Sequence, residues 1–145
     1  MYRKMGFTSI VCLQEWQKKK PKLGGVPGFM GMMMEDYDNP KYIPSDLRKA
    51  GLELFHIPVE DMKPPTKEQF DRFITYVDNP ERIVLAHCFA GIGRTGCMLA
   101  AYYGVKNQIS GRETIKAMRE IWQPYIQTYE QEDGVCDYIN SRLSI

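Results

Sequence analysis

The sequence lacks several features that would each assign it to a class of protein. It contains no run of about 18 apolar residues, and its charged first six residues lack an apolar stretch, so we expect neither a membrane span nor a secretion signal. The 19 basic residues almost balance the 18 acidic ones, which argues against binding nucleic acid or an anionic membrane through overall charge. Any preference for an anionic ligand must therefore come from a local site.

Cysteine is scarce and widely spaced. The four cysteines form neither the CxxC pairs of a zinc site nor the dense pattern of a secreted disulfide scaffold; they are Cys12, Cys88, Cys97 and Cys136. No cluster of metal ligands is visible, so we expect no metal and no cofactor. The pattern indicates a reducing, cytoplasmic setting. We interpret the three cysteines other than Cys88 as core residues rather than as its disulfide partners.

The length of 145 residues and the hydrophobic share of 43% suit one buried core, so we expect a single domain over residues 1–145 and a monomer. Three short apolar runs predict buried strands at 9–13, 52–57 and 83–87. Helical patterns are predicted at 45–50, 67–77, 94–106, 112–122 and 129–142. Thr66 with Gln69 is expected to cap the second of these helices, and Ser110 with Glu113 the fourth. This alternation predicts an α/β fold with a mainly parallel central sheet flanked by helices.

One segment, at about 17–44, does not follow this pattern. It is rich in Lys, Gly, Pro and Met and has no sustained period, which predicts an irregular loop. Two interpretations are open: a solvated insertion, or a border of the functional site where basic side chains attract a phosphorylated partner. The basic residues concerned are Lys18, Lys19, Lys20 and Lys22.

A second segment combines a strand end with glycines, a cysteine and an arginine. Residues 87–96 read His-Cys-Phe-Ala-Gly-Ile-Gly-Arg-Thr-Gly and run from the third predicted strand into the next helix. Ligands of open α/β sheets bind beyond the carboxyl ends of the strands, and a helix N-terminus offers unpaired N–H groups and a positive dipole end to an anion. The location predicts a site for phosphate or a similar oxyanion.

The residue types in this segment suit phosphate chemistry. Gly91, Gly93 and Gly96 would let the backbone curl and turn successive N–H groups inward. Arg94 can bind two phosphate oxygens at once. Together with the helix dipole it would favour the thiolate of Cys88 and make that residue a nucleophile near neutral pH. The competing interpretation, a small buried hydrophobic cysteine, does not account for three glycines at set positions.

The same ten residues resemble the signature of the protein tyrosine phosphatase superfamily, in particular its compact dual-specificity-like branch. The order of predicted strands and helices is similar to that family from about residue 8 onward, and Gln-Thr-Tyr-Glu-Gln at 127–131 resembles a segment of small microbial members. The resemblance implies a phosphotyrosine protein phosphatase-like fold and a cysteinyl-phosphate intermediate. It also implies a phosphate loop formed by Phe89, Ala90, Gly91, Ile92, Gly93 and Arg94.

The family mechanism needs a general acid, because a leaving group departs slowly without a proton. Asp61 follows the second predicted strand at the place of the family's acid loop. Glu60 is the rival, and a surface carboxylate without a catalytic role is the third interpretation. The match to the family pattern favours Asp61.

Three further residues receive roles by resemblance. Gln127 would orient the water that hydrolyses the intermediate, and the alternative is a polar residue that only starts a helix. The hydroxyl of Thr95 would stabilise the departing thiolate. His87, beside the nucleophile, is expected to order the loop by hydrogen bonding rather than to act as a base.

The predicted activity is hydrolysis of phosphotyrosine in phosphorylated proteins. Whether phosphoserine and phosphothreonine are also substrates is left open, because the sequence does not give the depth of the pocket. The phosphate loop contains no lysine, which disfavours a phosphoinositide, and the absence of a basic surplus disfavours RNA 5′-phosphates. The remaining alternatives are a phosphate-binding module without turnover and an enzyme that handles sulfur or arsenate.

Overall fold

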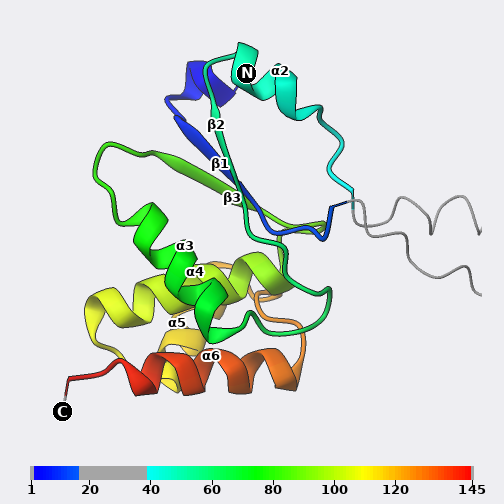
Figure 1. Ribbon diagram of the computed structural model, residues 1–145. Helices are drawn as coiled ribbons and strands as arrows, with labels where there is room; N and C mark the ends of the chain where they lie inside the picture. The colour runs from blue at the N-terminus through cyan, green and yellow to red at the C-terminus, as the bar shows by residue number, and fades with distance from the viewer. Residues whose placement is uncertain (1, 17–38, 145) are drawn as a thin grey trace, which may run out of the picture.

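In the described part of the chain, the sheet has three parallel strands. The computed structural model describes residues 2–16 and 39–144, in which a short 3₁₀ turn, η1 (Tyr2–Met5), precedes the first strand. The central strand β1 (Ser9–Cys12) lies between β2 (Glu53–His56) and β3 (Val84–His87), as Figure 1 shows. Each strand falls within a predicted run and both pairings are parallel, so the predicted α/β class is confirmed.

Two hydrophobic layers lie on opposite faces of this sheet. Ile10 belongs to a small cluster under helix α2 (Pro44–Lys49), and the next residue, Val11, belongs to the main core. Helices α3 (Lys67–Val77) and α4 (Gly93–Asn107) contribute to that main core. Because successive side chains of a strand point to opposite faces, the short central strand supports both layers, and all its residues are buried.

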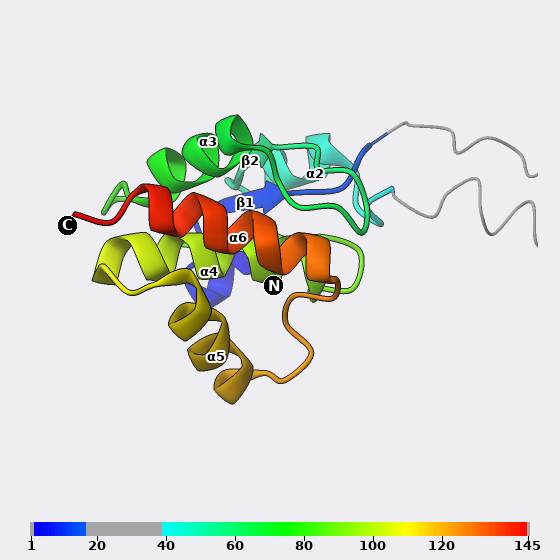
Figure 2. The ribbon, with the colours of Figure 1, turned by 90° about the horizontal axis from the view of Figure 1, so that it is seen from below.

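After β3 the chain is helical, and α4 is the central helix of this half. It contacts α3, α5 (Gly111–Ile121) and α6 (Tyr129–Ser141), and the views in Figures 1 and 2 show α5 and α6 beside it. A Cβ atom at Gly104 would lie 2.7 Å from both Ile139 Cδ1 and Thr114 Oγ1. The glycine therefore allows three helices to pack closely. All five predicted helices begin and end within one residue of the observed bounds.

Side-chain caps define where three of the helices begin. Thr66 and Gln69 form the predicted capping box of α3, in which each side chain accepts a hydrogen bond from the other residue's backbone N–H. Ser110 accepts a hydrogen bond from the backbone of α5, as its position predicts. Thr128 and Gln131 form a second capping box at α6, which was not predicted.

Some expectations concern residues outside the described part of the chain. Most of the predicted 17–44 loop lies there, together with its four lysines. Pro44, assigned to that loop, instead lies in the first turn of α2, where proline is well tolerated. The extent of the domain stays a prediction. Within the described ranges, no helix is both long and apolar enough to cross a membrane.

Candidate active site

All three strands end at one edge of the sheet, and the loop after each contributes to the site. Cys12 is in register with His56 on one side and with His87 on the other. Because the strands are parallel, the loops that follow them begin side by side. This arrangement brings Asp61, from the loop after β2, to the same edge as Cys88, from the loop after β3.

Cys88 begins the loop between β3 and α4. Its side chain is 7% exposed, whereas Phe89 beside it is 50% exposed and forms part of the rim. Gly91 has a φ of +72°, a conformation that glycine adopts without strain. Helix α4 begins at Gly93, so its free N–H groups and positive dipole end lie at the loop. A loop of this form can hold an anion against the sulfur.

The other two glycines of the motif serve packing rather than loop curvature. A Cβ atom at Gly93 would lie 2.5 Å from Gln127 Oε1, and one at Gly96 would lie 3.1 Å from the backbone nitrogen of Ile126. Both glycines belong to the regular part of α4. They allow the segment before α6 to lie against the start of α4. The expectation that all three glycines curl the loop is therefore correct only for Gly91.

Arg94 connects the phosphate loop to the other two loops. It is 2% exposed, and its Nη1 donates to the carbonyl oxygens of Val59 at 3.0 Å and Leu13 at 3.4 Å. Its Nη2 lies 3.4 Å from Oδ1 of Asp61. A buried guanidinium is costly without partners, and these contacts compensate for that burial. They also hold the guanidinium next to the carboxylate of Asp61.

The structure distinguishes the two candidate acids. Asp61 is the partner of Arg94 and its side chain is only 18% exposed, and its backbone N–H donates to Glu15 Oε1 at 3.4 Å. Glu60, by contrast, is exposed. The turn that follows contains Met62 with a φ of +65°, a conformation unusual outside glycine. This geometry favours Asp61 over Glu60 as the carboxyl group of the site.

Thr95 carries an unusual hydroxyl. The residue is 5% exposed, and its Oγ1 is buried without a hydrogen-bond partner among the residues that the structure describes. Leaving such a group unpaired costs about 1–3 kcal/mol. A hydroxyl in this state, one residue after Arg94, is ready to donate to a charged group that forms during a reaction.

Gln127 reaches the phosphate loop with the help of a residue that sequence analysis gave no role. The backbone N–H groups of Gln127 and Thr128 donate to Oε1 of Gln131 at 2.9 and 3.2 Å. The Nε2 of Gln131 donates to the carbonyl oxygen of Lys63 at 3.3 Å. Lys63 lies in the loop between β2 and α3, residues 57–66, which we call the acid loop. Gln131 is completely buried. It therefore joins the acid loop to the segment that carries Gln127.

His87 is fixed by hydrogen bonds on both ring nitrogens. Its Nε2 lies 2.7 Å from Oη of Tyr42, and its Nδ1 lies 3.2 Å from the carbonyl oxygen of Cys88. The rings of Tyr42 and His87 meet edge to face with centroids 5.4 Å apart. Sequence analysis missed Tyr42, because it lies far from the motif and within the segment predicted to be an irregular loop.

The charge states of this pair define the direction of the hydrogen bonds. Burial lowers the pKa of His87, and Arg94 adds to this effect, while the hydrogen bond to the Cys88 carbonyl opposes it. Burial and a hydrogen bond with Cys12 raise the pKa of Tyr42 far above its ordinary value. A neutral His87 must donate from Nδ1 because a carbonyl oxygen only accepts, so Tyr42 donates to Nε2. The pair thus orients the Cys88 peptide group.

A cavity of about 490 Å³ opens beside Cys88. Cys88 and Phe89 form one wall, Tyr42 and Lys41 form another, and Leu85 contributes apolar surface. The volume is typical of a pocket for a small ligand. In the described part of the chain, no group of three or more His, Cys, Asp or Glu side chains is arranged to hold a metal ion.

The other thiols differ from Cys88. Burial, reinforced by the charge of Cys88, raises the pKa of Cys97 to about 12, so Cys97 stays a thiol at neutral pH. Cys12 is fully buried in β1. All four cysteines are free. Of the four, only Cys88 lies in the loop that leads into α4, the helix that carries Arg94 in its first turn.

The fold is that of known protein phosphatases. The structure superposes on Tk-PTP with a TM-score of 0.72 and 22% sequence identity, over 96% of this chain and 82% of that one. It superposes on kinase associated phosphatase with a TM-score of 0.70 and 19% identity, over 97% and 72% of the two chains. These likenesses establish the architecture.

Comparison of sequences gives the family. A family model described as "Polymorphic toxin system, DSP-PTPase phosphatase" matches residues 32–107, just over half of the chain. The chain belongs to this family, and the resemblance to the dual-specificity-like branch of the protein tyrosine phosphatase superfamily is confirmed.

Sequence relatives extend across archaea and eukaryotes. An uncharacterized protein of Methanocaldococcus jannaschii is 37% identical over 93 residues, which are 61% of this chain and 60% of the relative. The human dual specificity protein phosphatase CDC14C is 33% identical over 70 residues, which are 48% of this chain and 16% of that protein. The chain therefore spans about 60% of the length of the first of these relatives and much less of the second.

Proposed function

We propose that this protein is a cysteine-dependent phosphatase that hydrolyses phosphotyrosine in proteins through a phosphorylated Cys88. The observation that supports this proposal best is the meeting of three loops at Arg94, which contacts Asp61 and lies on the loop that starts at Cys88. A nucleophile, an anion-binding guanidinium and a carboxyl group are the parts that phosphoryl transfer without a metal requires. The family membership supports the same activity.

In the first step, the Cys88 thiolate attacks phosphorus and a sulfur–phosphorus bond forms. The bond between phosphorus and the leaving oxygen breaks, and protonated Asp61 gives its proton to that oxygen. Arg94 and the N–H groups of the loop hold the other phosphate oxygens. Because a bound phosphate attracts the guanidinium that now pairs with Asp61, substrate binding frees the carboxyl group to face the leaving oxygen.

In the second step, water replaces sulfur on phosphorus. Asp61, now a carboxylate, removes a proton from the water, and the side chain of Gln127 orients this water over the loop. The sulfur–phosphorus bond breaks, and inorganic phosphate and the Cys88 thiolate are released. The unpaired hydroxyl of Thr95 donates to the sulfur as its charge returns.

The cavity beside Cys88 supports the proposed substrate class. Phe89 and Leu85 offer apolar surface next to Cys88, which suits the aromatic ring of phosphotyrosine, and phosphoserine and phosphothreonine are secondary candidates. The name of the human relative, a dual specificity phosphatase, supports testing all three. We further infer that the protein acts in a cytoplasm, because a catalytic thiolate requires reducing conditions and all four cysteines are free. We also propose that it is a monomer.

The test compares the wild type with Cys88→Ser on para-nitrophenyl phosphate and a phosphotyrosine peptide, with EDTA present. We expect metal-independent turnover in the wild type and less than about 1% of it in the variant, because serine is a much weaker nucleophile at neutral pH. Cys136→Ser, a change at a half-buried thiol on α6, is the matched control and should keep its activity. An inactive wild type that still binds phosphate would instead indicate a binding module.

A further inference from the structure

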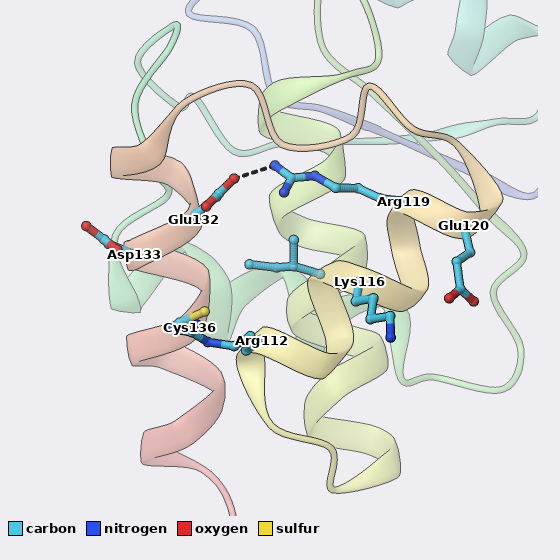
Figure 3. Close-up of a pocket in the computed structure, with 8 residues that line it drawn as sticks. Arg112, Lys116, Arg119, Glu120, Glu132, Asp133 and Cys136 are labelled. Carbon is cyan, nitrogen blue, oxygen red and sulfur yellow. Dashed lines mark hydrogen bonds and ion pairs between the residues drawn. The ribbon is translucent and has the colours of Figure 1, made fainter.

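A second cavity lies between α5 and α6. Its volume is about 540 Å³, and its walls carry side chains from both helices (Figure 3). Arg112, Lys116 and Arg119 contribute from α5, and Glu132 and Cys136 contribute from α6. None of these residues belongs to the loops around Cys88. This cavity therefore has no role in the catalytic reaction proposed above.

The cations of α5 form a row along the cavity. Arg112, Lys116 and Arg119 are four and three residues apart, a spacing that places side chains on one face of a helix. Arg119 is paired with Glu132 at 2.5 Å. Arg112 and Lys116 have no ion-pair or hydrogen-bond partner within the described ranges. Two positive charges thus remain uncompensated on the same wall.

Among the described residues, no acidic side chain of the cavity forms an ion pair with Arg112 or Lys116. Glu132 is already committed to Arg119. In Figure 3 the carboxylate of Asp133 points away from α5, and that of Glu120 points away from α6. The guanidinium of Arg112 lies beside Cys136, where its charge opposes the rise that burial causes in the pKa of that thiol. Asp133, Glu132 and Asp137 act on the same thiol in the opposite sense, so the lining carries both signs of charge, and Arg112 and Lys116 are its cations without an ion pair in the part of the chain that the structure describes.

We propose that the α5–α6 cavity is a second anion site, which binds a small molecule with two phosphate groups through Arg112 and Lys116. Two anionic groups match two cations one helical turn apart, and long flexible side chains can converge on one ligand. The volume accommodates such a molecule together with part of an attached scaffold. The site is separate from the catalytic loop, so it is independent of the proposed activity.

Arg119 gives this site a physical connection to the catalytic loops. Its Nε donates to the carbonyl oxygen of Tyr125 at 3.1 Å, and its Nη2 donates to that of Ile126 at 2.9 Å. The N–H of Ile126 donates to Ile92 in the phosphate loop at 3.2 Å. Arg119 thus joins the wall of the cavity to the segment just before Gln127.

The test uses methylenediphosphonate, whose phosphorus–carbon–phosphorus link cannot be hydrolysed, and follows backbone amide shifts by NMR. Amides of the phosphate loop and amides of α5 and α6 report on the two sites separately. We expect two sets of shifts with different saturation curves. In the double variant Arg112→Gln, Lys116→Gln, the affinity of the α5–α6 cavity for methylenediphosphonate should fall about tenfold or more, since two charge-assisted contacts are lost. The saturation curve of the phosphate-loop amides should stay unchanged.

Arg48→Gln, Lys49→Gln is the matched control, because it removes two positive charges from the last turn of α2. This control should leave both binding curves intact. The proposal is overturned if the α5–α6 amides do not shift, or if both double variants weaken the shifts equally. All four substituted side chains are exposed, so we expect both double variants to fold. If the Arg112→Gln, Lys116→Gln variant does not fold, the two single variants Arg112→Gln and Lys116→Gln replace it in the same measurement.

Discussion

The phosphate loop and the acid loop meet at Arg94, but they are held in place in different ways. The phosphate loop lies between the half-buried strand β3 and the first turn of α4, and its Ile92 carbonyl accepts a backbone hydrogen bond from Ile126. Its shape depends on glycine at position 91 and on main-chain contacts. Such a loop keeps its form when a surface side chain changes.

The acid loop, by contrast, is held largely by side chains from other elements. Gln69 of α3 donates to the Pro58 carbonyl at 2.5 Å, and Arg94 donates to that of Val59. Thr128 Oγ1 donates to the Met62 carbonyl at 3.3 Å. We infer that the acid loop is the adjustable part of the site, because each of these contacts can be lost without unfolding the sheet. The comparison indicates that main-chain contacts hold the loop that begins at Cys88, whereas side chains from other elements hold the loop that carries Asp61.

The largest expected effect on turnover comes from replacing the proposed general acid, Asp61, in the acid loop. Asp61→Asn should lower turnover about 10²-fold or more for aryl phosphates with poor leaving groups, and much less for those with good ones. Glu60→Gln is the matched control and should change little, because Glu60 is exposed. The measurement is kcat across a series of leaving groups. Equal losses for all leaving groups in Asp61→Asn would contradict the acid role.

A smaller effect is expected from the residue that joins the two loops. Gln131→Leu keeps the side-chain volume but removes the acceptor for the Gln127 and Thr128 N–H groups and the donor to Lys63. We expect kcat to fall about tenfold with KM nearly unchanged, and stability to fall by about 1–3 kcal/mol. Gln123→Leu, the same change on an exposed residue, is the control. A rise in KM alone would assign Gln131 to substrate binding instead.

The smallest effect tests how the phosphate loop is fixed. Burial holds the pKa of His87 below its ordinary value of 6.5, so the neutral form contributes stability above that value. As the pH falls below 6.5, the unfolded state takes up the proton first and this contribution is lost. His87→Asn can still donate to the Cys88 carbonyl but does not titrate.

The measurement is the free energy of unfolding as a function of pH in urea. We expect the loss of stability below pH 6.5 to be smaller in His87→Asn than in the wild type. His56→Asn changes the other histidine and serves as the comparison. A wild-type pH dependence that persists in His87→Asn would show that other groups cause it.

The sequence predicts the parts of this molecule that depend on local pattern. Runs of apolar residues locate all three strands, and caps such as Thr66 locate the helices. Cys88 and Arg94 belong to one short motif, so the sequence alone assigns them to the same site. Asp61 could be located only through resemblance to a family, because nothing in its immediate neighbours says that it pairs with Arg94.

Contacts between distant segments could not be predicted in the same way. Tyr42 reaches His87 from the segment before α2, and Gln131 reaches Lys63 from α6. Polar residues at these positions have no periodic or spacing signal. The capping pattern of Thr128 and Gln131 was available in the sequence, although it indicates a helix start and not a contact with the acid loop. Packing of one loop on another decides these contacts.

The most direct test of the central claim is to trap the phosphorylated enzyme. In Gln127→Ala, with water poorly oriented, the second step should become slower than the first. After rapid acid quenching during turnover of a phosphotyrosine peptide, we expect peptide mass spectrometry to find one phosphoryl group on Cys88. Full turnover in this variant with no phosphate on Cys88, or phosphate on another residue, would contradict the account.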